Sequence, residues 1–129
     1  MFFNAAIFVS VLAVVGFVIA APTGLQHGDG TFYATGLGAC GKVNVDTDMI
    51  AAVSHQFFNS FPGAGANPNN NPICGRAATV HHGSKTIKVQ ITDRCGGCKG
   101  ATDLDFSPSA FNKLADPSVG RIPITWTLD

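Results

Sequence analysis

The chain has 129 residues and carries eight acidic and eight basic side chains, so its formal net charge is zero. This balance gives no electrostatic footprint for nucleic acid or for an anionic membrane surface, and we expect neither as a partner. All the acids are aspartates, which favour turns over helix interiors, and there are 15 glycines. The composition predicts one loop-rich, mainly β domain with a modest core.

The first twenty residues have the pattern of a secretory signal peptide. An apolar segment over 5–20 ends in the small-residue cleavage pattern Val18-Ile19-Ala20, although no Lys or Arg precedes it. The segment is short for a membrane span, so a signal anchor is the weaker alternative. Cleavage leaves a secreted chain of 109 residues, in the extracellular space or the cell wall, with no membrane association. We expect 21–30 to be a flexible leader and 31–129 to be the folded domain.

Four cysteines follow this segment: Cys40, Cys74, Cys95 and Cys98. An even number in a small secreted chain predicts two disulfides, for which three pairings are possible. We favour Cys40–Cys74 together with Cys95–Cys98. A zinc site and a redox Cys-x-x-Cys motif are alternatives, but the first lacks a second paired spacing and the second lacks a helix beginning at its first cysteine. We expect no metal and no cofactor.

In chain order, the first predicted elements are a strand over 31–35 and a helix from 46–48 to about residue 58. The helix is indicated by an Asp-Thr-Asp N-cap region and by apolar residues at helical spacing after it. A long loop rich in Asn, Gly and Pro follows over 59–72.

The second half of the chain has clearer signals. Alternating segments over 76–82 and 85–92, joined by Gly83-Ser84, predict a hairpin. Ser107 followed by Pro108 is an N-cap and first-turn signal for a helix that ends before Pro117. A last alternating strand is predicted over 121–128.

Candidate site residues lie around the glycine-rich turn that holds the second pair of cysteines. Asp93 and Asp105 bracket this turn, so a compact fold would bring both carboxylates to one cleft. Thr31 and Tyr33 share one face of the first predicted strand. Asp103 is expected to be solvated and to point away from the face of Asp105.

Several short motifs occur in this chain in the same order as in a known protein family. These motifs are Gly30-Thr31-Phe32-Tyr33, Gly38-Ala39-Cys40-Gly41, Cys74-Gly75, Ile91-Thr92-Asp93, the segment 104–111 and the segment 120–126. The most specific part is Thr-Asp followed twelve residues later by Leu-Asp-x-Ser-Pro-x-Ala-Phe. The chain resembles the first domain of expansins, within the rare-lipoprotein-A-like double-psi β-barrel family. Among these it is most similar to the single-domain fungal expansin-like proteins called loosenins.

The resemblance implies a six-stranded double-psi β-barrel with two short helices, a monomer, and a groove for cell-wall polysaccharide (cellulose, chitin or peptidoglycan-like). It places the family's essential acid at Asp105 and its neighbouring acid at Asp93, as the functional acids, and it places groove residues at Thr31 and Tyr33. Cys95 stands where bacterial members carry an aromatic residue. Because the chain stops at Asp129, the second expansin domain is not expected.

Three functions follow as hypotheses. The first is a secreted protein that binds wall polysaccharide and loosens it without hydrolysis, because glycoside hydrolysis normally uses two carboxylates. Where related endoglucanases carry the second acid, this chain has Ala34 and Thr35. The second is a single-acid lytic glycosidase, and the third a secreted protease inhibitor or effector that acts through the loop 59–72. Some similar chains are labelled riboflavin aldehyde-forming enzymes, but no phosphate-binding glycine motif supports a flavin here.

Overall fold

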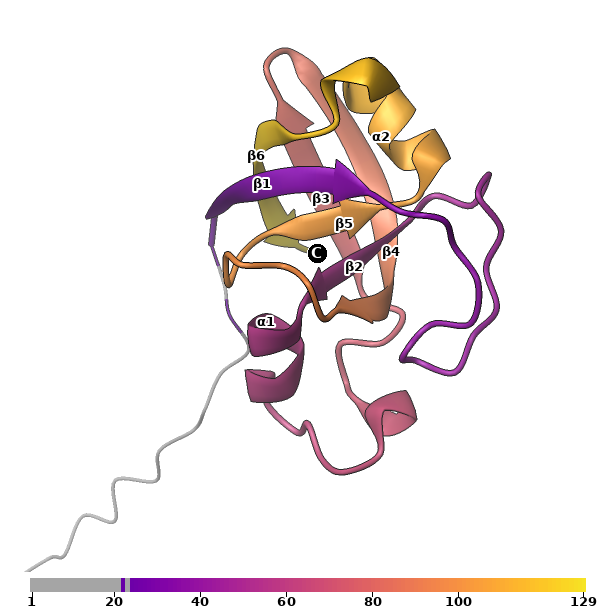
Figure 1. Cartoon of the computed structure of the whole chain (residues 1–129). Helices are drawn as coiled ribbons and strands as arrows, with labels where there is room; N and C mark the ends of the chain where they lie inside the picture. Colours follow the sequence, from indigo (N-terminus) through magenta and orange to yellow (C-terminus); the bar gives the residue numbers. More distant parts are fainter. Residues whose placement is uncertain (1–21, 23) are drawn as a thin grey trace, which may run out of the picture.

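The computed structural model describes residues 22 and 24–129, and the signal peptide expected over 1–20 lies outside the described residues. Six strands form a closed barrel in the order β1-β5-β2-β4-β3-β6 (Figure 1). The elements are β1 Gln26–Phe32, β2 Ile50–Ser54, α1 His55–Ser60, η1 Pro68–Asn70, β3 Ala77–His82, β4 Lys85–Cys95, β5 Leu104–Phe106, α2 Pro108–Leu114, η2 Pro117–Val119 and β6 Ile122–Leu128. The predicted mainly β, six-stranded barrel with two short helices is confirmed.

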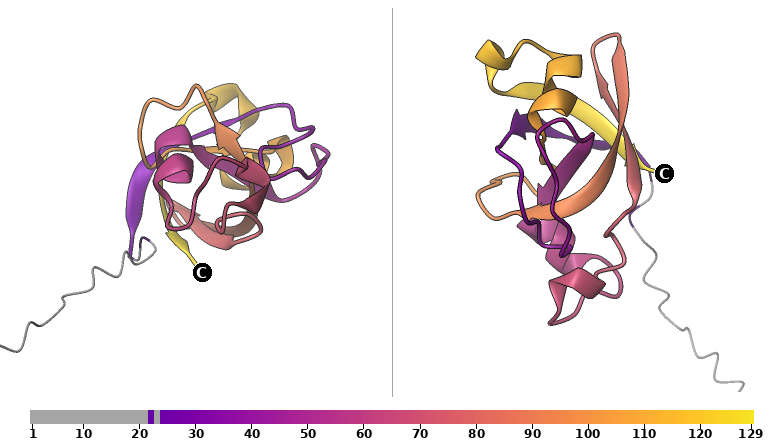
Figure 2. Two further views of the ribbon diagram at one scale, coloured as in Figure 1. Left: turned by 90° about the horizontal axis from the view of Figure 1, so that it is seen from below. Right: turned by 90° about the vertical axis from the view of Figure 1, so that its right-hand side faces the viewer.

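The barrel mixes two kinds of pairing. β1 pairs with β5, and β2 with β4, in parallel, whereas the other four pairs are antiparallel. α2 and the turn between β3 and β4 lie at one end of the barrel and α1 lies at the other (Figures 1 and 2). Because the sheet closes on itself, each of the six barrel strands has a neighbour on both sides.

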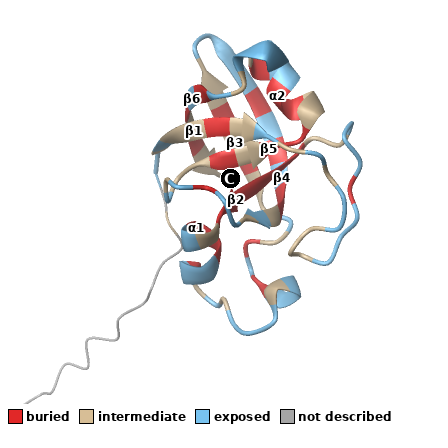
Figure 3. Ribbon diagram, viewed as in Figure 1, coloured by how far each residue is buried: buried red, intermediate tan, exposed pale blue. Residues whose placement is uncertain are grey.

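The core fills the barrel and extends beneath both helices. Its largest fully buried side chains are Trp126, Phe58, Phe106 and Phe111. The indole nitrogen of Trp126 donates a hydrogen bond to the carbonyl of Thr102 at 2.9 Å, which satisfies its polar group inside the protein. Figure 3 shows the buried positions running along the strands and on the inner side of α2.

The hairpin and the second helix form as predicted. β3 and β4 are antiparallel, and Ile87, Val89 and Ile91 are buried on one face of β4. The side chain of Ser107 caps α2 by accepting a hydrogen bond from the amide of Ala110, with proline in the first turn. Both elements rest on local signals, which explains why they can be read directly from the sequence.

The helix predicted from 46–48 to residue 58 is wrong in its first part. Ile50–Ser54 is the strand β2, and the helix begins only at His55, capped by Ser54. All five residues of β2 are buried, because the strand lies between β4 and β5 in the barrel wall. A short, fully apolar run has no alternation, so periodicity alone does not distinguish it from a buried helix.

The flexible leader expected over 21–30 is also too long. β1 begins at Gln26, and the segment 26–30 pairs residue by residue with β6. Glycine-rich composition suggested mobility here, but Gly28 lies so close to the turn before β5 that an added Cβ would come within 2.2 Å of the carbonyl oxygen of Thr102. The glycine permits this close approach between β1 and the turn.

The favoured disulfide pairing is confirmed. Cys40 is bonded to Cys74 and Cys95 to Cys98, so none of the four cysteines is a free thiol. Within residues 22 and 24–129, no group of three or more His, Cys, Asp or Glu side chains is arranged to hold a metal ion. No helix in the same part of the chain is both long and apolar enough to cross a bilayer.

Candidate functional site

A cleft of about 360 Å³ opens on the outer face of the barrel wall. It is lined by Thr31, Tyr33, Ala52, Asp93, Arg94, Cys95, Gly96, Gly97, Cys98, Asp103, Asp105 and Arg121. The four site residues that the sequence predicted are all in this lining. The structure therefore brings together residues from β1, β4 and β5 that are up to 74 positions apart in the chain.

One row of directly opposed positions forms the floor of the cleft. Thr31 on β1 lies opposite Asp105 on β5, Asp105 lies opposite Ala52 on β2, and Ala52 lies opposite Asp93 on β4. Neighbouring strands are about 4.8 Å apart, so the backbones of the two acids are about 10 Å apart. Only the methyl group of Ala52 stands between the two carboxylates in this row, which leaves room for a ligand above it.

A β-bulge turns Asp93 toward the cleft. The register between β2 and β4 shifts at this point, because Ala51 lies opposite Ile91 but Ala52 lies opposite Asp93. Strict alternation after Ile91 would direct residue 93 into the core. The extra residue, Thr92, takes the buried position instead, at 2% exposure, and Asp93 faces outward.

The carboxylate of Asp93 accepts three hydrogen bonds from the protein. Its Oδ1 accepts hydrogen bonds from the amides of Ala39 and Arg94, both at 2.8 Å. Its Oδ2 accepts one from the Oη hydroxyl of Tyr33 at 3.0 Å. Asp93 therefore holds the loop between β1 and β2 against the cleft, in addition to any contact with a ligand.

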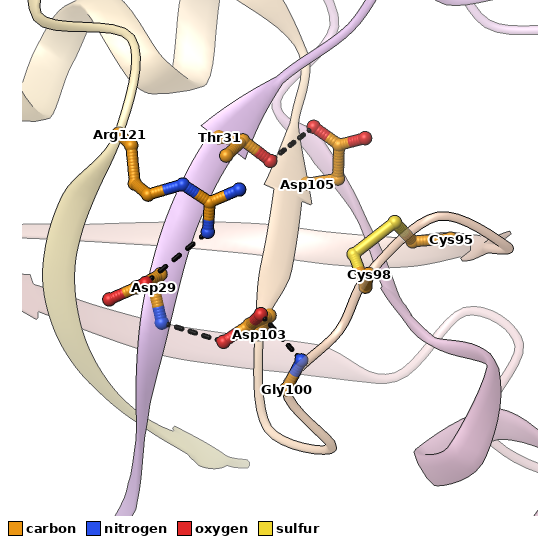
Figure 4. Close-up of polar contacts among 8 residues, drawn as sticks. All are labelled: Asp29, Thr31, Cys95, Cys98, Gly100, Asp103, Asp105 and Arg121. Atoms are coloured by element: carbon orange, nitrogen blue, oxygen red, sulfur yellow. Dashed lines mark hydrogen bonds and ion pairs between the residues drawn. A yellow bond between two sulfur atoms is a disulfide. The ribbon is translucent and has the colours of Figure 1, made fainter.

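The carboxylate of Asp105 is much less engaged. It accepts one hydrogen bond, from the Thr31 hydroxyl at 2.8 Å, and is half-buried (Figure 4). Burial raises the pKa of Asp105, the Thr31 hydrogen bond and the Arg121 charge oppose the rise, and the charge of Asp93 adds to it. The net effect is a raised pKa, so Asp105 holds its proton to higher pH than an ordinary aspartate does. This suits a group that donates a proton or a hydrogen bond.

Tyr33 remains a hydrogen-bond donor. Burial raises the pKa of its phenol well above the usual range, and the charge and hydrogen bond of Asp93 raise it further. Its amide donates to the carbonyl of Phe106 at 3.0 Å, one residue beyond the end of β1. The phenol therefore stays protonated and fixed on Asp93, at the side of the cleft opposite Arg121.

Asp103 is not the solvated residue that the sequence led us to expect. It lines the cleft, and its carboxylate accepts hydrogen bonds from the amides of Asp29 and Gly100, both at 2.9 Å (Figure 4). The expectation was wrong because residues two apart in an extended segment share a face, so Asp103 lies on the same side as Asp105.

Sequence reasoning also missed Arg121, one of the two arginines in the lining of the cleft. Arg121, the residue immediately before β6, crosses β1, and its Nη1 lies 3.2 Å from Oδ2 of Asp29 (Figure 4). Asp29 had been assigned to the leader, although it lies two residues before Thr31 and alternation could have placed it on the same face. No local signal points to Arg121, because only the pairing of β1 with β6 brings it here.

The far wall of the cleft is the turn closed by Cys95 and Cys98. A Cβ added at either Gly96 or Gly97 would meet nothing within 4 Å, so the cleft is open at this end. Tyr33 is the one aromatic residue in the lining. The lining therefore offers mainly polar groups and no broad aromatic surface.

Three of the four histidines of the chain lie away from this cleft. His27, His81 and His82 line a second, shallower cleft of about 300 Å³. Nδ1 of His81 is 2.9 Å from the Thr86 hydroxyl, and Nδ1 of His82 is 2.6 Å from the Pro123 carbonyl. Both rings have partners within the barrel wall.

Comparison with known proteins gives consistent matches. A family model described as lytic transglycolase, for a double-psi β-barrel domain, matches residues 26–126. The structure of the Streptomyces papain inhibitor superposes with a TM-score of 0.74 at 32% identity, over 84% of this chain and 98% of that chain. An aspartate-to-asparagine mutant of Clavibacter michiganensis expansin in complex with cellohexaose gives 0.65 at 32% identity, over 82% of this chain and 50% of that chain.

Two curated relatives are similar over most of this chain but are longer. An allergen homolog from Arthroderma benhamiae is 35% identical over 78% of this chain, which spans 31% of that protein. The papain inhibitor from Streptomyces mobaraensis is 34% identical over 74% of this chain and 66% of that protein. The chain thus covers about a third and about two thirds of their respective lengths.

Proposed function

The chain belongs to the double-psi β-barrel family whose model is described as lytic transglycolase, and on that premise we propose that it is a secreted protein that binds cell-wall polysaccharide and loosens it without hydrolysis. The glycan lies in the cleft, across the row from Thr31 to Asp93. The similarity to an expansin that was crystallised with cellohexaose supports an extended, β-linked chain as the ligand.

The observation that carries the proposal is the unequal engagement of the acids. Hydrolysis of a glycosidic bond uses two carboxyl groups, one as acid and one as base or nucleophile. Asp93 accepts three hydrogen bonds and Asp103 accepts two, all from the protein. Asp105 is therefore the one acid in this cleft lining with most of its hydrogen-bonding sites free. One free acid suits binding or single-acid chemistry better than hydrolysis.

In this proposal protonated Asp105 donates a hydrogen bond to a glycosidic oxygen or a sugar hydroxyl. Thr31 fixes the orientation of its carboxyl group, and Arg121 supplies further donors to the sugar at the β1 side. Binding over several sugar units then holds one glycan chain in a conformation that no longer packs against the neighbouring glycan chains of the fibre. Asp93 contributes its negative charge and the placement of Tyr33, so it is a positioning residue.

The test uses cellulose and chitin fibres with the 21–129 protein and with Asp105→Asn. We expect fibre weakening without released sugar, and loss of weakening in the variant. Asp116→Asn serves as the matched control, because Asp116 is an exposed aspartate that lies outside the lining of the cleft, and fibre weakening by this variant should equal that of the wild type. No weakening of either fibre by the wild-type protein would contradict the proposal.

The pH dependence of fibre weakening follows from the same acid. Because the pKa of Asp105 is raised, the protonated form persists to higher pH than at an ordinary aspartate and is lost as the pH rises through that value. Weakening should therefore decline between about pH 4 and pH 8. A steady increase over this range would contradict a role for the protonated acid.

A second candidate function is lytic cleavage by Asp105 alone, with a hydroxyl of the sugar itself as the nucleophile. The description of the matching family model favours it. Soluble oligosaccharides released by the wild-type protein and absent with Asp105→Asn would establish cleavage and replace the non-hydrolytic proposal.

A third candidate function is inhibition of a papain-like protease. It is favoured by the superposition on the Streptomyces papain inhibitor over 98% of that chain. Inhibition and glycan binding do not exclude each other, because they can use different surfaces of one barrel. The third candidate needs a surface that a protein would recognise.

A further inference from the structure

The loop between β1 and β2 contains a small two-stranded ribbon over 36–45. The amide of Gly38 donates to the carbonyl of Lys42 at 3.0 Å, and the amide of Asn44 donates to the carbonyl of Gly36 at 2.9 Å. Between these two bonds, Leu37 and Val43 lie directly opposite each other. They form a non-hydrogen-bonded pair, in which the two side chains are close together on one face of the ribbon.

This face is apolar and exposed to solvent. Leu37 is 74% exposed and Val43 is 70% exposed. Val45, at 58%, lies two residues after Val43 and therefore on the same face. These are three of the six large hydrophobic residues that are exposed in the described part of the chain. Scattered exposed aliphatic residues are ordinary, but three on one side of a ten-residue ribbon form a patch.

The ribbon is firmly held, so its exposure does not come from fraying. Its turn is bonded to the loop before β3 by the Cys40–Cys74 disulfide and to β4 by the hydrogen bond from the Ala39 amide to Asp93. At its end, Asp48 accepts hydrogen bonds from the Val45 amide and the Asn44 side chain, both at 3.0 Å. A preformed ribbon loses little conformational freedom when a partner binds it.

The backbone of the ribbon is also suited to recognition. In a non-hydrogen-bonded pair the N–H and C=O groups of the two residues point away from each other, toward the outer sides of the ribbon. Leu37 and Val43 therefore offer an extended segment with outward backbone groups and an aliphatic side chain on each side. A protein cleft that reads extended peptides uses both features, through main-chain hydrogen bonds and apolar side-chain pockets.

We propose that the apolar face of the ribbon 36–45 docks in the substrate cleft of a papain-like cysteine protease. The proposal rests on the third candidate function, and it replaces the loop 59–72 that the sequence suggested. In that loop no large hydrophobic residue is exposed, and Phe61 is 4% exposed within the core. Asn71 is likewise buried, and its side chain is bonded to the carbonyl of Phe58 at 2.8 Å.

The experiment measures inhibition of papain that has been activated with thiol and then freed of it, so that both disulfides stay intact. The 21–129 protein is compared with the pair Leu37→Ser and Val43→Ser. The matched control is the pair Leu25→Ser and Val119→Ser, since these residues are 52% and 57% exposed but lie outside the ribbon. All four positions are on the surface, so the variants should fold, which their melting temperatures check.

We expect competitive inhibition by the wild-type protein and by the control pair. Each lost aliphatic contact should raise the inhibition constant about tenfold, and the ribbon pair about a hundredfold. Fibre binding by the ribbon pair should equal that of the wild type, which separates this proposal from the glycan proposal. Absence of wild-type inhibition, full inhibition by the ribbon pair, or equal loss in the control pair would overturn it.

Discussion

Each side of the cleft carries an aspartate, and the two aspartates differ in how many hydrogen bonds they accept from the protein. On the β4 side, Asp93 accepts hydrogen bonds from Ala39, Arg94 and Tyr33. On the β5 side, Asp105 accepts one bond, from Thr31, and burial raises its pKa. The first carboxylate holds a loop in place, whereas the second is free to act on a ligand.

This difference shows that the proximity of two acids does not make a hydrolytic pair. Ala52 separates them in the cross-strand row, and three donors from the protein already occupy acceptor sites on Asp93. A variant that disturbs the β4 side should therefore change stability first, and one on the β5 side should change activity first. The following predictions test this comparison, from the largest expected effect on stability to the smallest.

Removing the disulfide that anchors the loop should have the largest effect. The Cys40–Cys74 bond joins residues 34 positions apart, and the pair Cys40→Ser and Cys74→Ser should lower the free energy of unfolding by about 4 kcal/mol. The Cys95–Cys98 bond spans three positions, and its removal should cost about 2 kcal/mol. Urea unfolding measures both, and equal losses would contradict the chain-entropy explanation.

Asp93→Ala should be the next most destabilising change. It leaves the Ala39 amide and the Tyr33 hydroxyl without their acceptor in a partly buried site, at a cost of about 2 kcal/mol. Asp93→Asn is the matched control, because its amide oxygen can still accept from Ala39 and Arg94, and it should cost less than about 1 kcal/mol. If the two variants unfold at the same urea concentration, Asp93 does not hold the loop.

Ala52→Leu should block the cleft at a smaller cost in stability. The larger side chain would stand in the row between the two acids, and because this position borders the cleft we expect a loss of about 1 kcal/mol, the low end for overpacking. Binding to cellulose or chitin fibres should be lost, while the melting temperature changes little. Unchanged fibre binding would place the glycan somewhere other than this row.

Asp105→Asn should have the smallest effect on stability, of less than about 1 kcal/mol. Because the folded pKa of Asp105 is raised, the wild type gains stability as the pH falls through that pKa and loses it as the pH rises. The variant cannot titrate there, so at about pH 7 it should melt no lower than the wild type, and at about pH 3 any advantage should disappear. Thermal unfolding at both pH values checks this. A variant that melts lower than the wild type only at neutral pH would show that the folded pKa of Asp105 is lowered and not raised.

Much of the barrel could be predicted from local sequence. The β3–β4 hairpin has alternating residues around Gly83-Ser84, and α2 has the Ser107 cap followed by Pro108. Asp93 and Asp105 were singled out because they bracket the glycine-rich turn, and Thr31 and Tyr33 through the resemblance to expansins; all four line the cleft. These features are encoded within a few neighbouring residues or in a motif order, so they do not depend on knowing which strands pair.

The errors arose where pairing between distant segments overrides local pattern. Ile50–Ser54 carries no alternation because the strand is buried on both sides, so it was taken for a helix. The strand segment 26–30 was taken for a leader because its glycines suggest mobility, whereas they permit close contact between strands. Asp103 was misplaced by a mistaken reading of the alternation itself.

The sequence by itself determined the strands with clear alternation, the capped second helix and the motif order that marks the acids. Only the tertiary structure decided the surroundings of those acids. The bulge at Thr92 faces Asp93 outward, the β1–β6 pairing brings Arg121 beside Asp29, and the ribbon that rests on Asp93 exposes Leu37 and Val43. The physical reason is that register, burial and the number of available hydrogen-bond donors at a carboxylate depend on segments that meet only when the barrel closes.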